Sequence, residues 1–507
     1  MRANNVLKNG FWGSIYQISN IVLGFISRTV FIYYLNSEYL GISGLFTNVL
    51  NMLSLTELGF SSAIAFHLYG LLAREDHENI AGIMNFYKNI YRAIAGCIFI
   101  MGLAIIPFLH LIIKQSSFDI SYIRLVYVIY LINTVISYFY AYKFTLAVAD
   151  QKNYILTNVD TIFKFVMTLV NIFVLVILKN FIVYLISGII LSLICNYIKG
   201  REVSKRYQYL SNKIKIKSEY KKKILFDVKN IFAGKLSTVI VTSTDNILIS
   251  AIVNISSVGL YSNYSMIIGY IQSFLTQFVS ATQASIGNMI ASESKEYSYD
   301  ILKKLTVIVY FATSFCTVCL YVLLNPFINI WLGEKYLLSI DTVAWCVLSF
   351  YIQLVKAPVW YSLGGVGYFQ KDRNISIVGA VSNLIISIIC AYFFGLSGIF
   401  MGTVFSQLIQ WFLKTKLFIN VYLERSSREY ICLFLKLILL TLIFSKVTFE
   451  LCEIISIGNI YQNFAVKVLL CLILPNMVNI ILFRNSVAFE YCCNTLMRLF
   501  WKLRKKI

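Results

Sequence analysis

The chain has little charge, and acidic charge is especially scarce. Only 13% of its 507 residues are charged, whereas 59% are hydrophobic. A soluble fold of this length cannot bury so much apolar surface, which excludes the soluble enzyme classes. The long apolar runs also lack the alternation of apolar and polar residues that a transmembrane barrel requires. Composition therefore predicts an all-α polytopic membrane protein.

Several chemical signatures are missing as well. The sequence has 3 histidines, and they belong to no Ser/His/Asp set. The 11 cysteines fall in or beside apolar runs, so we expect neither disulfides nor a metal centre. Cys316 and Cys319 have the spacing of a metal motif, but without a second pair they are predicted to pack. No cofactor is expected. No cleavable signal is evident, so the first span should stay attached.

About fourteen apolar stretches are long enough to cross a bilayer as helices. They cover residues 11–35, 41–66, 88–113, 121–143, 155–178, 181–199, 229–253, 258–288, 304–330, 338–362, 374–393, 397–414, 430–446 and 460–483. With the N-terminus placed inside, the outer segments contain only Lys114, Lys179, Lys335 and Lys446, while most of the 44 basic residues fall on inner segments. This asymmetry predicts that both termini are cytoplasmic.

A basic segment divides the spans into six before it and eight after it. The predicted domains are an N-terminal six-helix bundle at 1–200, a cytoplasmic linker at 201–228, a second six-helix bundle at 229–424, two additional helices at 425–483 and a cytoplasmic amphipathic tail at 484–507. The net charge of +21 is dispersed over many loops, which argues against nucleic acid as a partner. The linker lysines Lys221, Lys222 and Lys223 can contact anionic membrane lipids or simply anchor the topology.

Two short segments suggest an internal duplication. Glu38–Leu45 lies between the first two spans, and Ser256–Asn263 lies between the seventh and eighth, 218 residues later. Each has a glycine, Gly41 or Gly259, at the start of the returning helix. A shift of six spans keeps the direction of every helix, so the halves are expected to be parallel repeats.

Charged residues inside spans are the candidate functional residues, because each costs roughly 2.5 to 3.5 kcal/mol at a helix centre. The basic candidates are Arg28, Lys164, Lys235 and Lys356, and the acidic ones are Glu57, Asp160 and Asp245. Lys164 can pair with Asp160 one turn back or contact substrate. Lys235 and Lys356 can reach the cytoplasmic surface instead. Glu57 and Asp245 can neutralise a base or bind a coupling cation or proton.

Amides on the eighth predicted span extend this polar set. Gln272, Gln277, Gln283 and Asn288 do not form one stripe, yet a lipid-facing helix would not carry four amides. We expect them to face a hydrated interior, with Gln283 as a candidate substrate contact.

Several motifs resemble those of the polysaccharide biosynthesis proteins, flippases for lipid-linked oligosaccharides within the multidrug/oligosaccharidyl-lipid/polysaccharide exporter superfamily. They are Asn9–Trp12, Leu35–Gly41 with the helix that reaches Glu57–Gly59, Asp245 followed by Gly259–Tyr261, Asn325–Tyr336 and Gly395–Thr403. Their order and spacing agree with the family over most of the chain.

The resemblance implies two six-helix bundles in a V, two extra helices and alternating access of a central cavity. The implied cargo is an undecaprenyl-diphosphate-linked glycan that crosses the bacterial inner membrane for assembly of O-antigen in lipopolysaccharide, capsule or exopolysaccharide. Implied partners are membrane lipids and the polysaccharide polymerase machinery. Basic cavity residues would meet the diphosphate. A proton, a sodium ion or the membrane potential can supply the energy.

Two other functions compete with this interpretation. A multidrug or cation exporter of the same superfamily would need a cavity in which carboxylates outnumber bases, and the candidates here lean slightly the other way. A polysaccharide polymerase or ligase would need a sizeable outer loop, whereas the longest predicted one covers only residues 446–459. We therefore expect no enzyme activity.

Overall fold

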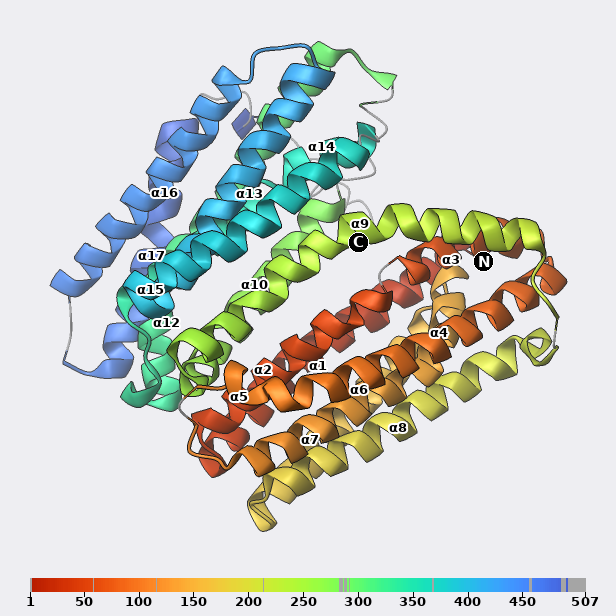
Figure 1. Ribbon diagram of the computed structural model, residues 1–507. Helices are drawn as coiled ribbons and strands as arrows, with labels where there is room; N and C mark the ends of the chain where they lie inside the picture. Colours follow the sequence, from red (N-terminus) through yellow and green to blue (C-terminus); the bar gives the residue numbers. More distant parts are fainter. Residues whose placement is uncertain are drawn as a thin grey trace. The chain divides into compact units, whose positions relative to one another are not determined.

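Helices make up all the regular structure in the described part of the chain (Figure 1). The computed structural model describes residues 2–490, except 58, 115, 213, 282–285, 287–289, 291, 367–368, 456–457 and 485–488. Within these ranges ten helices are long and apolar enough to cross a membrane. The predicted all-helical, multi-pass fold is confirmed, while the count of fourteen spans stays a prediction.

The first of two compact units ends at Gly259. Its helices are α1 (Arg2–Tyr34), α2 (Ser37–Leu53), α3 (Phe60–Ala73), α4 (His77–Ile105), α5 (Leu109–Ile112), α6 (Ile120–Ala149), α7 (Tyr154–Ile177), α8 (Phe181–Arg206) and α9 (Ser218–Leu248). The segment before α9 lies on α4, because the Asn85 amide donates to the carbonyl oxygens of Asn212 at 2.7 Å and Ile214 at 3.2 Å. Helix α9 then packs on α2 and α3. The predicted domain borders near 200 and 228 stay predictions.

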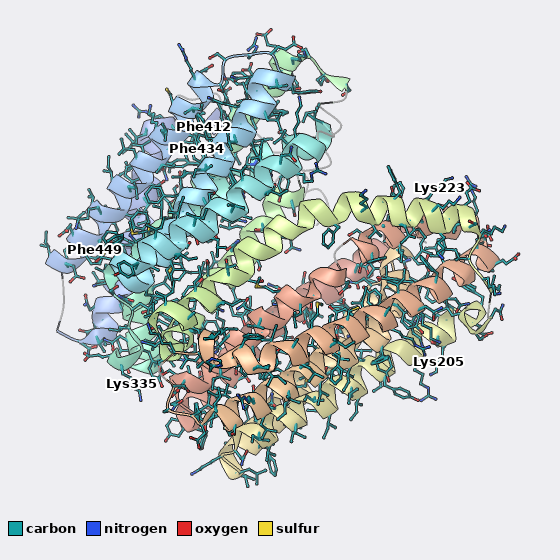
Figure 2. All side chains as sticks on the ribbon, viewed as in Figure 1. Lys205, Lys223, Lys335, Phe412, Phe434 and Phe449 are labelled. Carbon is teal, nitrogen blue, oxygen red and sulfur yellow. The ribbon has the colours of Figure 1, made fainter. Side chains whose placement is uncertain are left out.

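The second unit begins at Leu260. It contains most of α10 (Ile255–Ala281), then α12 (Lys295–Leu332), α13 (Ile340–Val355), α14 (Ala357–Val366), α15 (Phe369–Lys416), α16 (Arg428–Ile454) and α17 (Ile460–Phe483). Its core joins α12, α13, α15 and α16. There Trp411 stacks on Phe434 with ring centroids 3.8 Å apart, and Figure 2 shows Phe434 on α16. This buried aromatic pair anchors α16 to the second half of α15.

Helix α15 is two antiparallel helices joined at Gly395. That residue has φ 56° and ψ −130°, a backbone conformation that breaks the helix and favours glycine. Beyond the turn, Gly398 lies against the backbone of Cys390, and Gly402 lies against Ser387. A Cβ atom at either glycine would clash with that neighbour. The predicted spans 374–393 and 397–414 flank this turn, so the sequence located the hairpin correctly.

The two segments of the suggested duplication contact each other within the first unit. A Cβ atom on Gly41 would overlap the carbonyl of Ile255, and one on Gly259 would overlap the carbonyl of Ser37. The same 218-residue spacing that relates Gly41 to Gly259 also relates Ser37 to Ile255. The contact is therefore two-fold symmetric, with equivalent residues exchanging places, as in an isologous interface. Only glycine allows the two backbones to approach so closely.

Candidate functional site

Helices α1 and α7 lie side by side and run in the same direction. Their register therefore gives the relative positions of Arg28 on α1 and Lys164 on α7 along the helix axes. At their beginning, the Tyr154 backbone N–H donates to Asn9 Oδ1 at 2.7 Å. At their far end, Phe31 packs on Phe181, with ring centroids 6.0 Å apart. From this register, Lys164 lies near mid-depth and Arg28 lies about 13 Å further along, at a rise of 1.5 Å per residue. The structure therefore places these two cations at different depths.

Asp160 on α7 is neutralised by Lys199 of α8. The Lys199 ammonium lies 2.8 Å from Asp160 Oδ1, and the lysine side chain is 12% exposed. Lys199 also lies over the ring of Phe144, 4.6 Å from its centroid. The expected alternative in which Asp160 pairs with Lys164 is wrong, because α8 continues to Arg206 and brings Lys199 within reach.

Lys164 has no counter-ion among the described residues. In the described ranges its half-buried ammonium makes no ion pair or hydrogen bond. It lies on the α7 face that carries buried Thr161 and Thr168, at helical spacings of three and four residues. Asn171, one turn beyond Thr168, has a buried side-chain oxygen with no hydrogen-bond partner among the described residues. This face of α7 is thus polar and incompletely satisfied.

We expect the Asp160–Lys199 pair to support the fold of the first unit. Lys199→Met leaves a carboxylate without its cation, and we expect a loss of about 2 kcal/mol, less than for a fully buried pair because Asp160 is partly exposed. The double variant Lys199→Met/Asp160→Leu should recover most of that loss. Denaturant unfolding of the four proteins in a double-mutant cycle measures the coupling.

A surface ion pair on the same helix serves as the control for this cycle. Lys205 contacts Glu202 at 3.3 Å and is 59% exposed, and Figure 2 shows it near the end of α8. Lys205→Met should change the unfolding free energy by no more than about 0.5 kcal/mol. Additive effects of the Asp160 and Lys199 substitutions would contradict the pairing.

The remaining candidates of the first unit lie apart from Lys164. Arg28 is half-buried and interacts electrostatically with Tyr184 of α8. Asp245 is half-buried on α9, after the buried Ser243 and Thr244. Glu57 lies in the break between α2 and α3, surrounded by hydroxyl groups. The side chain of Lys235 and the whole of Gln283 lie outside the described residues.

Lys356 in the second unit is buried rather than extended to the surface. Its backbone N–H caps the end of α13 by donating to the carbonyl oxygen of Ile352. Its side-chain nitrogen lies 5.0 Å from the centroid of the Trp360 ring, and that of Lys414 lies 4.4 Å from the same centroid. Lys414 in turn pairs with Asp372 at 2.7 Å. The two lysine side chains therefore share one indole ring, and Asp372 pairs with Lys414.

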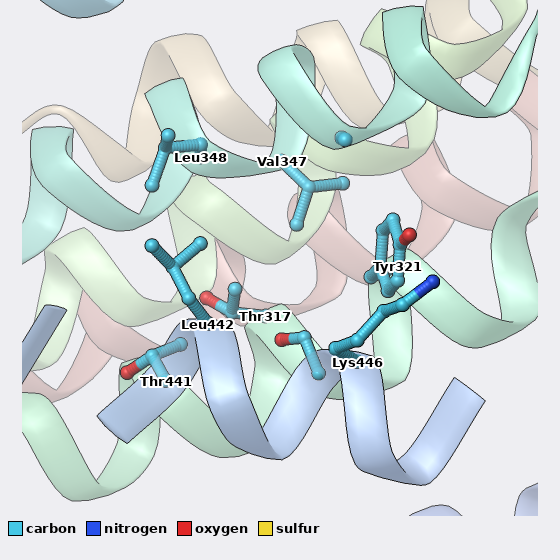
Figure 3. A pocket seen from close by; sticks show the side chains of 9 residues that line it. Thr317, Tyr321, Val347, Leu348, Thr441, Leu442 and Lys446 are labelled. Carbon is cyan, nitrogen blue, oxygen red and sulfur yellow. The ribbon is translucent and has the colours of Figure 1, made fainter. Parts of the chain in front are cut away.

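An apolar groove of about 280 Å³ lies on the second unit between α12, α13 and α16. Its lining residues are Thr317, Tyr321, Ala344, Val347, Leu348, Thr441, Leu442, Ser445 and Lys446. Figure 3 shows Tyr321 and Lys446 at one end of the groove and Leu348 at the other. The groove is mainly apolar, and Lys446 at its end pairs with Glu450 at 2.6 Å.

Comparison with known proteins identifies the family of this chain. A family model described as polysaccharide biosynthesis protein matches residues 6–286, more than half of the chain. The chain belongs to this family. The suspected resemblance is confirmed, and the polysaccharide biosynthesis family is one of membrane transport proteins rather than enzymes. No curated protein matches the chain significantly.

Solved structures show the same fold across the superfamily. A lipid II flippase MurJ in an inward closed conformation matches with a TM-score of 0.68 at 16% identity, covering 94% of this chain and 99% of that chain. An inward-facing multidrug resistance MATE family transporter matches with a TM-score of 0.63 at 14% identity, covering 78% and 92%. The Vibrio cholerae MATE transporter VcmN matches with a TM-score of 0.57 at 11% identity, covering 83% and 98%. This member of the polysaccharide biosynthesis family therefore has the flippase and exporter fold.

Sequence reasoning missed two features of the candidate site. The sixth predicted span ends at Lys199, where the apolar run stops, whereas the helix continues for about two more turns to Arg206. The hydroxyl groups around Glu57 include Tyr87 and Tyr91, whose spacing of four residues on one helix face was a usable signal. Aromatic belts at the membrane surface explain most tyrosines in such sequences, which hid this pair.

Proposed function

We propose that the protein flips an undecaprenyl-diphosphate-linked oligosaccharide from the cytoplasmic to the outer face of the bacterial inner membrane by alternating access. The glycan would then enter O-antigen, capsule or exopolysaccharide assembly, with both termini of the protein cytoplasmic and the polymerase machinery as a partner. The observation that supports this substrate class is Lys164 near mid-depth, which has no counter-ion among the described residues.

The charge of the head group accounts for the cations. A diphosphate cannot enter hydrocarbon unaided, because it would lose hydration worth far more than a few kcal/mol. Ammonium and guanidinium groups replace that hydration with charge-assisted hydrogen bonds. Arg28 and Lys164 lie at successive depths beside the α1–α7 contact, so a head group can meet one cation after the other. Asp160 does not cancel this charge, since Lys199 neutralises it.

The lipid part of the cargo and the driving force are also consistent with the fold. The groove between α12 and α16 offers apolar surface to a prenyl chain, with Val347, Leu348 and Leu442 in its lining. Moving negative charge outward across an inside-negative membrane is favourable by roughly 2.3 kcal/mol per charge per 100 mV. The membrane potential therefore supports export in the proposed direction.

Flipping in proteoliposomes tests the proposal. The full chain is reconstituted with a fluorescent undecaprenyl-diphosphate oligosaccharide, and a membrane-impermeant quencher reports which leaflet holds it. We expect the protein to accelerate exchange between leaflets, and an imposed potential to bias its direction. A polyprenyl glycoside without phosphate is the control and should not move. Efflux of ethidium without movement of the glycolipid would favour the exporter alternative and contradict the proposal.

A further inference from the structure

Helix α13 and the second half of α15 run in parallel and are joined by polar contacts between their side chains. The Thr342 and Ser397 hydroxyl oxygens lie 2.7 Å apart. Further along both helices, the Gln407 amide donates to Ser349 Oγ at 2.9 Å. Because the contacts advance in the same direction on the two helices, they fix the register in which α13 and α15 approach their ends.

This register brings two lysines together at the end of α13. Lys356 follows Ser349 by seven residues, and Lys414 follows Gln407 by seven. Seven residues are about two helical turns, so each lysine lies on the face that carries the preceding contact. The structure agrees, since both side-chain nitrogens lie over the Trp360 ring and Lys414 acts electrostatically on Lys356. The earlier contacts each join a donor to an acceptor, whereas this position holds two lysines.

The described residues supply one acceptor group for these two side chains. Asp372 pairs with Lys414 at 2.7 Å. Lys356 is only 6% exposed, and in the part of the chain that the structure describes it makes no ion pair or hydrogen bond. An ammonium group has three donors, and burying it beside a second cation is costly unless an anion pairs with it. The end of α13 therefore lacks an acceptor for Lys356.

Buried polar groups on the neighbouring turn of α15 also lack partners. Trp411 Nε1 and Thr415 Oγ1 are buried and have no hydrogen-bond partner within the described ranges. Both residues lie within one turn of Lys414 in the α15 helix. An indole N–H can only donate, so the partner that Trp411 lacks is an acceptor. Buried polar groups in native proteins are almost always hydrogen-bonded, which makes several such groups in one place informative.

One edge of this cluster is open. The Asp372 side chain is 35% exposed, whereas that of Lys414 is 4% exposed. Two residues further along α15, Lys416 is exposed and lies 4.4 Å from the centroid of the Phe412 ring, which Figure 2 labels. The two buried lysines thus lie near the ends of their helices, within reach of the polar surface on the side of Asp372.

We propose that Lys356 and Lys414 bind a phosphate-type oxyanion at this end of the second unit. A tetrahedral oxyanion presents several acceptor oxygens, which match two ammonium groups and the unpartnered indole N–H of Trp411. Two sources share this chemistry. They are inorganic phosphate and the phosphate of an anionic lipid head group, which basic pockets between membrane helices can hold. This site uses neither Arg28 nor Lys164 and does not rest on the proposed function.

Equilibrium dialysis of the purified full chain against radiolabelled inorganic phosphate tests the site directly. The detergent contains no phosphate, and chloride keeps the ionic strength constant. We expect saturable binding of about one phosphate per chain, and Lys356→Met should weaken it about tenfold, as loss of one charge-assisted hydrogen bond can do. Lys416→Met is the matched control, because it removes an exposed lysine that also lies over an aromatic ring of α15. Its affinity should stay within about twofold of the wild type.

Thermal unfolding without phosphate separates a ligand site from a structural lysine. Methionine fills a similar volume without a polar group, so Lys356→Met should be at least as stable as the wild type when no anion is present. Phosphate should raise the unfolding midpoint of the wild type and of Lys416→Met but not that of Lys356→Met. Lys356→Gln, which keeps a donor, is the second variant if Lys356→Met does not fold, and it should also lose the response.

Nanodiscs distinguish the two sources of the anion. The wild type and Lys356→Met are compared in phosphatidylcholine with and without phosphatidylglycerol. If a head group occupies the site, phosphatidylglycerol should raise the midpoint of the wild type alone and displace labelled phosphate. If inorganic phosphate is the ligand, its binding should not change with the lipid. Equal responses of wild type and Lys356→Met to both ligands would overturn the proposal, as would a less stable Lys356→Met that binds phosphate normally.

Discussion

Gly259→Ala is expected to destabilise the first unit strongly. The added methyl group would overlap the carbonyl of Ser37, and this obstacle is backbone within α2 rather than a flexible side chain. Relief requires the two helices to separate, which also disturbs the equivalent contact of Gly41 with Ile255. Overpacking of this kind costs roughly 3 kcal/mol and can exceed it. Thermal unfolding in detergent should show a lower midpoint, or no folded protein.

Gly269→Ala is the matched control for that substitution. Gly269 is also on α10, but a Cβ atom there meets nothing within 4 Å. Alanine has the higher helix propensity, so this variant should be as stable as the wild type or more stable by up to about 1 kcal/mol. Equal midpoints for Gly259→Ala and Gly269→Ala would show that the glycine crossing does not limit the approach of α2 and α10.

Lys164→Glu is expected to reduce glycolipid flipping at least tenfold. The substitution replaces the unpaired cation near mid-depth by an anion that repels a diphosphate. A tenfold change in rate requires only about 1.4 kcal/mol, which one charge-assisted hydrogen bond can supply. Lys164→Arg keeps the charge and should retain most of the activity. Initial rates in the proteoliposome assay, normalised to reconstituted protein, measure both variants.

Charge reversal elsewhere in the first unit distinguishes an effect of the Lys164 position from an effect of the changed net charge. Arg124 is exposed near the beginning of α6, so Arg124→Glu makes the same change of formal charge at an exposed position near a helix end. Its effect on flipping should be less than twofold, because exposed charges are screened. Wild-type rates in Lys164→Glu, with normal expression and unfolding, would remove the main support for an anionic cargo.

The sequence predicted the helices well because each one is an apolar run ended by polar residues. The predicted stretches 155–178 and 460–483 agree with α7 and α17 almost to the residue. Errors occur where a helix continues past the apolar run, as α8 does. Hydropathy indicates how much of a helix contacts lipid, whereas the backbone hydrogen bonds of the helix can continue into polar sequence. The interruption of the second span was also missed, because Ser54–Gly59 contains no proline and lies between two apolar runs.

By itself, the sequence determined that the protein lies in a membrane, that it is helical and where its helix pairs turn. Burial in lipid requires each span to satisfy its own backbone, so these properties follow from local composition. Only the tertiary structure decided which charges are cancelled. Asp160 pairs with Lys199, and Lys356 shares the Trp360 ring with Lys414. Glu57 accepts a hydrogen bond from Ser61, and Lys164 has no counter-ion in the part of the chain that the structure describes. Partners on separate helices are brought together by packing, and sequence spacing does not encode that arrangement.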